Sequence, residues 1–209
     1  MAASSRRKRA PQVLPDTDTD ESLLARACAG DEDAFLSIYT RHRAGLYRFA
    51  CRLLGDSSAA EDVTHDCFLS LFKHPERFDA ARGATLRTYL FAAVRNLSLK
   101  QFRRAAQETL IDEAADEQRA PDAEQPLSRV LEAELSAAVR AAVEGLPALQ
   151  REVLILFEFE NLSLQEIAVV VGTEANTVKS RLARARAGLR RALAPHLERR
   201  AELVGASEK

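Results

Sequence analysis

Apolar side chains recur at steps of three and four along most of this chain, which is the spacing of one face of an α-helix. The clearest example, residues 34–54, is followed by Gly55, a residue type that ends helices. A capping box of Ser58 and Glu61 is expected to start the next helix, and Thr85 to cap a further one that runs to Arg104. Alternating apolar and polar residues, the pattern of a strand, form no stretch of useful length. The chain is therefore predicted to be all-α.

The helical spacing fails between residues 105 and 127, where seven acidic residues accompany a single base, Arg119, and two prolines interrupt the segment. This composition is typical of a self-repelling, extended linker. We predict a flexible acidic linker over 105–128 that joins a helical domain at 21–104 to a second one at 129–195. Residues 1–20 are expected to form a disordered arm and residues 196–209 a tail. A frayed acidic helix is the alternative for the linker.

The composition limits the functions open to the chain. Its 30 Lys+Arg and 31 Asp+Glu leave a net charge of −1, which excludes a uniformly basic coat for nucleic acid. The longest apolar runs are too short to span a bilayer, and three cysteines without a CxxC pattern fit a reducing cytoplasm. The four histidines have no metal-ligand or catalytic-triad spacing, and no glycine-rich phosphate loop occurs. We therefore predict a cytoplasmic protein that is not an enzyme and needs no metal or cofactor.

Residues 161–193 follow the pattern of a helix-turn-helix. Ser163 and Glu166 form a capping box at the start of a short helix, and Gly172 ends that helix. Val178 and Leu182 then begin the buried face of a longer second helix. In a helix-turn-helix, this second helix enters the major groove of DNA.

A helical wheel sorts the side chains of this second helix. Val178, Leu182, Ala185 and Leu189 share a narrow arc that is expected to face the core. Between residues 177 and 191 there are six basic residues and no acidic one, unlike a solvated surface helix, which mixes signs. Small residues beside Arg184 let the helix approach the nucleobases closely. Basic side chains on the flanks of the helix suit contacts with phosphates. The predicted DNA-binding residues are Lys179, Ser180, Arg181, Arg184 and Arg186.

The helix at 86–104 is also free of acids and carries five bases. Asn96, Lys100, Arg103 and Arg104 follow one another at helical spacing and so share a face. Nearby aromatic residues suit the stacking of bases in single-stranded nucleic acid. Tyr89 and Phe91 also fit a plain core role, so spacing alone leaves this second nucleic-acid surface open.

Several segments, taken together and in order, resemble one protein family. They are 21–35, 60–69 (Ala-Glu-Asp-Val-Thr-His-Asp-Cys-Phe-Leu), 89–104 with its Arg-Asn pair, 146–154 (Leu-Pro-Ala-Leu-Gln-Arg-Glu-Val-Leu), 163–172 and 176–186. The chain resembles the extracytoplasmic-function (ECF) group of bacterial RNA polymerase sigma factors. The resemblance covers about 21–104, which is similar to sigma region 2, and 129–195, which is similar to region 4.

The resemblance implies two partners, core RNA polymerase and promoter DNA. On the polymerase side it implies that the clamp is contacted by Asp62, His65 and Asp66, and the flap by a hydrophobic surface around Val153, Leu156 and Phe157. On the DNA side it implies that the −10 element, where the family flips out a base, is faced by Arg95, Asn96, Lys100, Arg103 and Arg104. The −35 element is then read by the helix-turn-helix residues given above. Members of this group are usually held inactive by an anti-sigma protein, which no residue here identifies.

A stand-alone helix-turn-helix regulator is the alternative function. Such a protein dimerises, binds a palindromic duplex tightly and needs no polymerase. The charge pattern favours the sigma factor, because the rest of the chain outside the two basic stretches has a net negative charge that suits docking on a basic enzyme.

Overall fold

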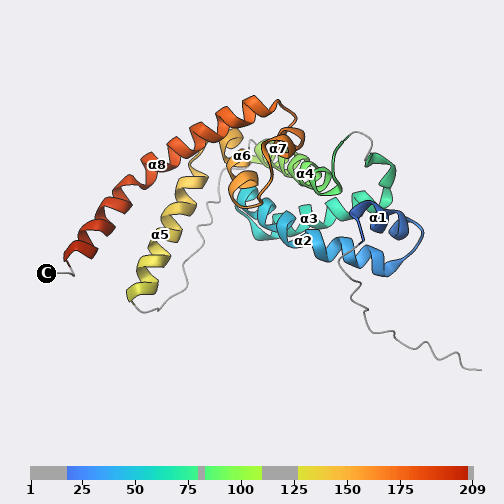
Figure 1. Cartoon of the computed structure of the whole chain (residues 1–209), viewed down its shortest axis with the longest axis horizontal. Helices are drawn as coiled ribbons and strands as arrows, with labels where there is room; N and C mark the ends of the chain where they lie inside the picture. Colours follow the sequence, from blue (N-terminus) through green and yellow to red (C-terminus); the bar gives the residue numbers. More distant parts are fainter. Residues whose placement is uncertain (1–17, 80–82, 110–126, 207–209) are drawn as a thin grey trace, which may run out of the picture.

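The computed structural model describes the backbone of residues 18–79, 83–109 and 127–206, and the side chains of 18–79, 83–103 and 134–196. Within these ranges the regular structure is helical, as predicted. The N-terminal domain contains α1 (Asp20–Cys28), α2 (Glu32–Leu54), α3 (Ser57–Lys73), the short 3₁₀ helix η1 (Pro75–Arg77) and α4 (Leu86–Thr109). The C-terminal domain contains α5 (Leu127–Glu144), α6 (Ala148–Glu158), α7 (Leu164–Val171) and α8 (Ala175–Ala206). Figure 1 shows both domains.

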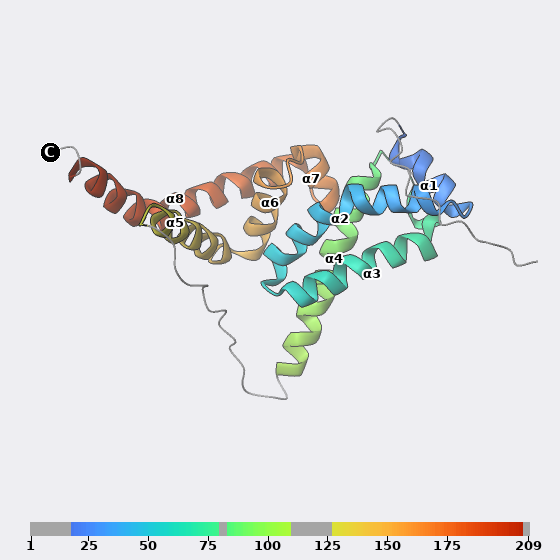
Figure 2. The same cartoon turned by 90° about the horizontal axis from the view of Figure 1, so that it is seen from below.

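In the N-terminal domain, α2 packs against α1, α3 and α4. The predicted helical stripes form its core, with fully buried Ile38, Leu46, Phe49, Leu71 and Leu90. Because α2 contacts each of the other three α-helices of this domain, it lies at the centre of the domain's packing. Figure 2 shows α2 and α3 running alongside each other beneath α1.

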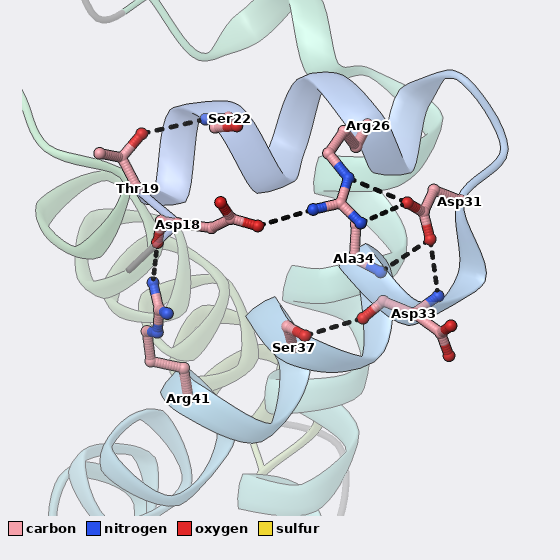
Figure 3. Close-up of polar contacts among 9 residues, drawn as sticks. All are labelled: Asp18, Thr19, Ser22, Arg26, Asp31, Asp33, Ala34, Ser37 and Arg41. Carbon is pink, nitrogen blue, oxygen red and sulfur yellow. Dashed lines mark hydrogen bonds and ion pairs between the residues drawn. The ribbon is translucent and has the colours of Figure 1, made fainter. Parts of the chain in front are cut away.

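An ion cluster fixes the corner between α1 and α2 (Figure 3). The guanidinium of Arg26 donates to the carboxylate of Asp31 at 2.7 and 2.9 Å and to that of Asp18 at 2.6 Å. Asp31 also caps α2, since its Oδ1 accepts the backbone N–H groups of Asp33 and Ala34. These hydrogen bonds hold the pKa of the Asp31 carboxyl below its usual value, the one from Arg26 contributing most. The cap and the ion pair therefore share one carboxylate.

The expected capping box of Ser58 and Glu61 is wrong. Helix α3 begins two residues earlier than this box implies, and Asp56 caps it by accepting the backbone N–H groups of Ser58 at 2.7 Å and Ala59 at 2.9 Å. Aspartate is as good an N-cap as serine and stands at the residue before the helix, so Ser58 lies within the first turn. Thr85 does cap α4, because its hydroxyl accepts the backbone N–H of Thr88.

Three helices extend further than expected. Helix α4 continues beyond Arg104 to Thr109, and α5 begins at Leu127, so both enter the segment expected to be a linker. The rest of that segment, 110–126, and the expected arm up to residue 17 lie outside the described residues. Helix α8 includes Pro195 and runs to Ala206, through most of the expected tail. A proline removes one backbone donor, which here does not end the helix.

In the C-terminal domain, α8 packs against α5, α6 and α7. Helix α5 lies along α8 on one side of the molecule (Figure 1). The core is built from the expected stripe of α8 together with α6 and α7, and includes fully buried Leu154, Ile155, Leu156, Ile167 and Val178. No described helix is both long and apolar enough to cross a membrane.

The two domains pack directly against each other. Helix α4 contacts α7, and α2 contacts α6, so the helix expected to face the −10 element touches the first helix of the helix-turn-helix (Figure 2). Buried apolar side chains from both domains join in one cluster. This packing decides which of the basic side chains are exposed.

Candidate nucleic-acid interface

The turn between α7 and α8 has the geometry of a helix-turn-helix. The predicted capping box is present: Ser163 Oγ accepts the backbone N–H of Glu166, and the Glu166 carboxylate accepts that of Ser163 at 2.8 Å. This second hydrogen bond is the main cause of a lowered pKa at Glu166. Gly172 ends α7 with φ of +70°, a left-handed conformation that suits glycine. The cap and the turn together fix the angle at which α8 leaves α7.

Helix α8 buries and exposes the faces that the helical wheel predicts. Val178 and Ala185 are fully buried, and Leu182 is 5% exposed. Lys179, Ser180, Arg184 and Arg186 are exposed, while Arg181 is half-buried. The hydroxyl of Ser180 donates to the backbone oxygen of Thr177, within the helix itself. A basic face is therefore presented away from the protein core.

Arg186 is already paired within the protein. Its guanidinium donates twice to Glu158, at 2.6 and 2.9 Å, and lies over the ring of Phe157. Both charged side chains are partly exposed, so water screens this pair. Glu158 thus orients Arg186 along the flank of α8.

Helix α4 exposes only part of its predicted basic face. Asn96, Lys100 and Arg103 are exposed, and the side chain of Arg104 lies outside the described residues. The aromatic residue that α4 exposes is Phe102, at 45%, whereas Phe91 is buried. Phe91 therefore packs in the core and is not available for stacking with nucleobases, the other role that its spacing left open.

The three residues expected to contact polymerase lie together on α3. Asp62, His65 and Asp66 are all exposed, because the apolar stripe of α3 faces the other way. Asp62 and His65 border a small hollow of about 150 Å³ whose walls include Tyr39 and Tyr47 of α2. The arrangement offers a protein partner acidic groups beside aromatic rings. Among the described side chains, no cluster of His, Cys, Asp and Glu could hold a metal ion.

Comparison with known proteins identifies the family. Sigma-70 region 2 matches residues 38–108, and Sigma-70, region 4 matches residues 136–189. The ECF RNA polymerase sigma factor SigW of Bacillus subtilis is 30% identical over 78% of this chain and 91% of its own length. SigM of Mycobacterium tuberculosis, also an ECF sigma factor, is 33% identical over 84% of this chain and 85% of its own length. This chain belongs to the ECF group of RNA polymerase sigma factors.

Two solved structures resemble most of this sigma factor. The sigma factor RpoE in complex with the anti-sigma factor NepR from Bartonella quintana is 25% identical, with a TM-score of 0.59 over 77% of this chain and 96% of its own. CnrH in complex with the cytosolic domain of CnrY is 27% identical, with a TM-score of 0.62 over 85% of this chain and 99% of its own. Both matches extend across the two helical domains.

The expected flap-binding surface of the sigma factor needs correction. Val153 and Leu156 are fully buried in the C-terminal core, and Phe157 is only partly exposed. Val153 and Leu156 pack where α6 meets α2, α7 and α8, so these two side chains offer no docking surface in this structure. The large apolar side chain that α6 exposes is Leu149, at 50%. Residues 153–156 of this apolar run are all buried, because α2, α7 and α8 pack against α6.

Arg95, which the resemblance assigns to the −10 element, is bonded to the other domain in this structure. Instead of facing solvent, its guanidinium donates to both oxygens of the Glu152 carboxylate on α6, at 2.7 and 3.2 Å. The two side chains are 15% and 6% exposed, respectively. Arg95 is therefore the one predicted DNA contact on α4 whose described side chain is engaged with the other domain.

Sequence reasoning missed the charged contacts around Glu160. This residue follows α6, and its carboxylate is 2% exposed between the arginines Arg48 and Arg52 of α2. Charged residues at the end of a helix usually face solvent, so their pattern gave no signal. The available signal was Gly45, a glycine inside an otherwise regular helical stretch, which often marks a close approach of another segment.

Proposed function

We propose that this sigma factor binds core RNA polymerase through α3, reads the −35 element with α8 and faces the −10 element with α4. On this proposal, a region 2-like domain spans 21–104, an acidic linker spans 105–128 and a region 4-like domain spans 129–195. It works in the cytoplasm, where promoters and polymerase are found, as an initiation factor rather than an enzyme.

The exposed basic face of α8 is the observation that carries this proposal. Arg184 stands exposed with Ala183 and Ala187 beside it on the face opposite the buried stripe. Small neighbours let a helix lie deep in the major groove, where an arginine donates two hydrogen bonds to guanine. Lys179 and Arg190 lie exposed on the flank, in positions that suit phosphates.

The distribution of charge explains why this sigma factor would need polymerase. Eleven of its 30 Lys+Arg lie in the two acid-free stretches, 86–104 and 177–191, so the remaining chain has a net charge of −12. Because non-specific affinity for DNA comes mainly from neutralised phosphates, that acidic remainder weakens DNA binding by the isolated chain. The same acidity favours docking on a basic enzyme surface. Promoter binding then requires both partners.

An anti-sigma protein is a further expected partner. The RpoE structure contains the anti-sigma factor NepR, and the CnrH structure contains the cytosolic domain of CnrY. We infer that this chain is regulated by a protein of the same kind.

The decisive experiment mixes the full-length chain with core polymerase and measures co-elution and transcription from a promoter library. We expect co-elution and initiation at a narrow set of sites. Replacing Asp62, His65 and Asp66 together with alanine should abolish co-elution, while replacing the exposed Glu21 and Glu32 of the same domain should not. A chain that never co-elutes, yet binds a palindromic duplex tightly, is instead the stand-alone regulator.

A further inference from the structure

Two buried carboxylates of the C-terminal domain contact arginines of the N-terminal domain. Glu152 of α6 binds Arg95 through two hydrogen bonds, as described above. A carboxylate loses its hydration when buried, and an isolated one is costly. A two-fold contact with a guanidinium compensates for that cost and also fixes the orientation of both groups.

Glu160 makes the second contact, with three arginines from two helices. Its Oε2 accepts from Arg48 at 3.3 Å and its Oε1 from Arg52 at 3.4 Å, both on α2. Its backbone oxygen accepts from Arg87 of α4. Burial raises the pKa of Glu160, although Arg48, Arg52 and Arg87 partly offset this effect. One residue therefore joins α2 and α4 to the end of α6.

The surroundings of Glu160 are shaped to receive it. Gly45 lies opposite on α2, and a β-carbon there would be 3.2 Å from Oε2 of Glu160. The guanidinium of Arg52 also lies 4.3 Å from the centre of the Phe159 ring. A cation over an aromatic face adds to the attraction between the domains. These contacts extend the packing of α4 on α7 and of α2 on α6.

The consequence concerns DNA, because Arg87 and Arg95 belong to the acid-free helix that is proposed to face the −10 element. While Arg95 is bonded to Glu152, it cannot also bond a phosphate or a base. Helix α8, in contrast, keeps Lys179 and Arg184 exposed in the same conformation. Closing the molecule therefore removes cations from one DNA surface and leaves the other accessible.

We propose that Glu152 and Glu160, with Arg48, Arg52, Arg87 and Arg95, form an interdomain ion cluster that holds this sigma factor closed and withholds part of α4 from DNA. This inference rests on the proposed function. The cluster acts within one chain, without an anti-sigma protein. Docking on polymerase separates the domains and frees Arg95 for nucleic acid. The cluster thus links promoter access to polymerase binding.

The test replaces both carboxylates in the full-length chain (Glu152→Gln with Glu160→Gln). Solution X-ray scattering should show a larger radius of gyration. Affinity for a single-stranded oligo-dT probe should rise about tenfold, the gain expected when a binding-competent state goes from about a tenth of the population to nearly all of it. Adding Arg95→Ala to this variant should remove most of the gain. Co-elution with core polymerase should persist, because neither carboxylate lies on the α3 face.

A matched control removes two exposed carboxylates of α5 (Glu134→Gln with Glu144→Gln). It changes the net charge equally and should leave the radius of gyration unchanged. The charge-exchanged pair Arg95→Glu with Glu152→Arg provides a second test, because each single change should open the chain and the pair should close it again. If the carboxylate variant matches the control in both size and DNA affinity, the ion cluster does not hold the chain closed. Loss of polymerase co-elution by the unmodified chain would instead overturn the proposed function.

Discussion

Gly45 and Glu160 are 115 residues apart in the sequence, yet a β-carbon on the glycine would lie 3.2 Å from the carboxylate oxygen of the glutamate. That separation is tighter than nine in ten real β-carbon contacts, so Glu160 or α2 would have to shift by a few tenths of an ångström. A glycine inside a helix costs about 1 kcal/mol relative to alanine. The close approach between the domains accounts for a residue that α2 alone does not need.

Gly45→Ala should therefore have two opposite effects. It should strengthen α2 through helix propensity, and it should loosen the domain contact by disturbing the hydrogen bond between Glu160 and Arg48. We expect a larger radius of gyration by solution scattering without loss of helix content by circular dichroism. Thr40→Ala, on the exposed side of α2, is the control, since it favours the helix without approaching Glu160. Equal radii for both variants would contradict the assignment of Gly45.

Gly172→Ala should lower the free energy of unfolding of the C-terminal domain by about 1 kcal/mol, measured by urea titration. A β-carbon at this position meets no atom within 4 Å, so the loss comes from the left-handed backbone alone. Gly172→Asn should lose less, because asparagine tolerates that conformation better than alanine does. If alanine is tolerated as well as asparagine, the turn does not require positive φ in solution.

The lowered pKa of Asp20 predicts how the stability of the corner between α1 and α2 depends on pH. Its carboxylate bonds His42 at 2.8 Å and Arg41 at 2.6 Å. Burial alone would raise the pKa of Asp20, but the interactions with His42 and Arg41 outweigh it, and the pKa falls below the usual 3.8. Because the pKa is lower in the folded chain, this stabilisation is present above pH 3.8 and is lost as the pH falls through the folded value.

Asp20→Asn should accordingly lower the free energy of unfolding by about 1.5–3 kcal/mol at pH 7, the range for hydrogen bonds to charged groups. The difference from the unmodified chain should shrink to nothing once both are measured below the folded pKa. Chemical unfolding followed across the acid range provides the measurement, with the exposed Glu21→Gln as control. A difference that persists unchanged in acid would show that packing rather than charge is responsible.

Two substitutions in α8 should separate the reading of bases from the binding of phosphates. Arg184→Ala should cost about 1–3 kcal/mol in promoter binding by the polymerase complex and relax the preference at one upstream base pair. Lys179→Ala should weaken binding about equally for all sequences and reduce the slope of affinity against salt by about one. Binding to duplexes with every −35 position varied distinguishes the two effects. Unchanged base preference in the Arg184 variant would mean that another side chain reads that position.

The cysteines should differ in reactivity because their burial differs. Cys67 is buried in the N-terminal core, its thiol faces the backbone oxygen of Leu90 at 3.7 Å, and burial raises its pKa to about 12. Iodoacetamide at pH 8 should therefore leave Cys67 unmodified in the folded chain and modify it in urea. Cys28 is exposed and should react in both conditions. Mass spectrometry of the digested protein identifies the alkylated residues, and rapid labelling of folded Cys67 would contradict its burial.

Local pattern was enough to predict the all-helical character of the chain and the faces of α8. The spacing of Val178, Leu182 and Ala185 placed them in the core, and Ser163 and Glu166 formed the expected cap, because helical periodicity and capping depend on residues within one or two turns. The six basic residues of 177–191, with no acidic residue among them, likewise predicted an exposed basic face that includes Arg184. The resemblance to the family rested on the same local segments.

Contacts between distant residues could not be obtained in this way. The residues near Arg95 in the sequence do not predict that its guanidinium donates to Glu152, 57 residues later. Nothing near Glu160 tells that arginines of two other helices surround it. A charge on an isolated helix is best placed in water, and it is buried only when folding brings a partner of opposite sign to the same place. The packing of the two domains therefore determines which basic side chains of this sigma factor are available to DNA.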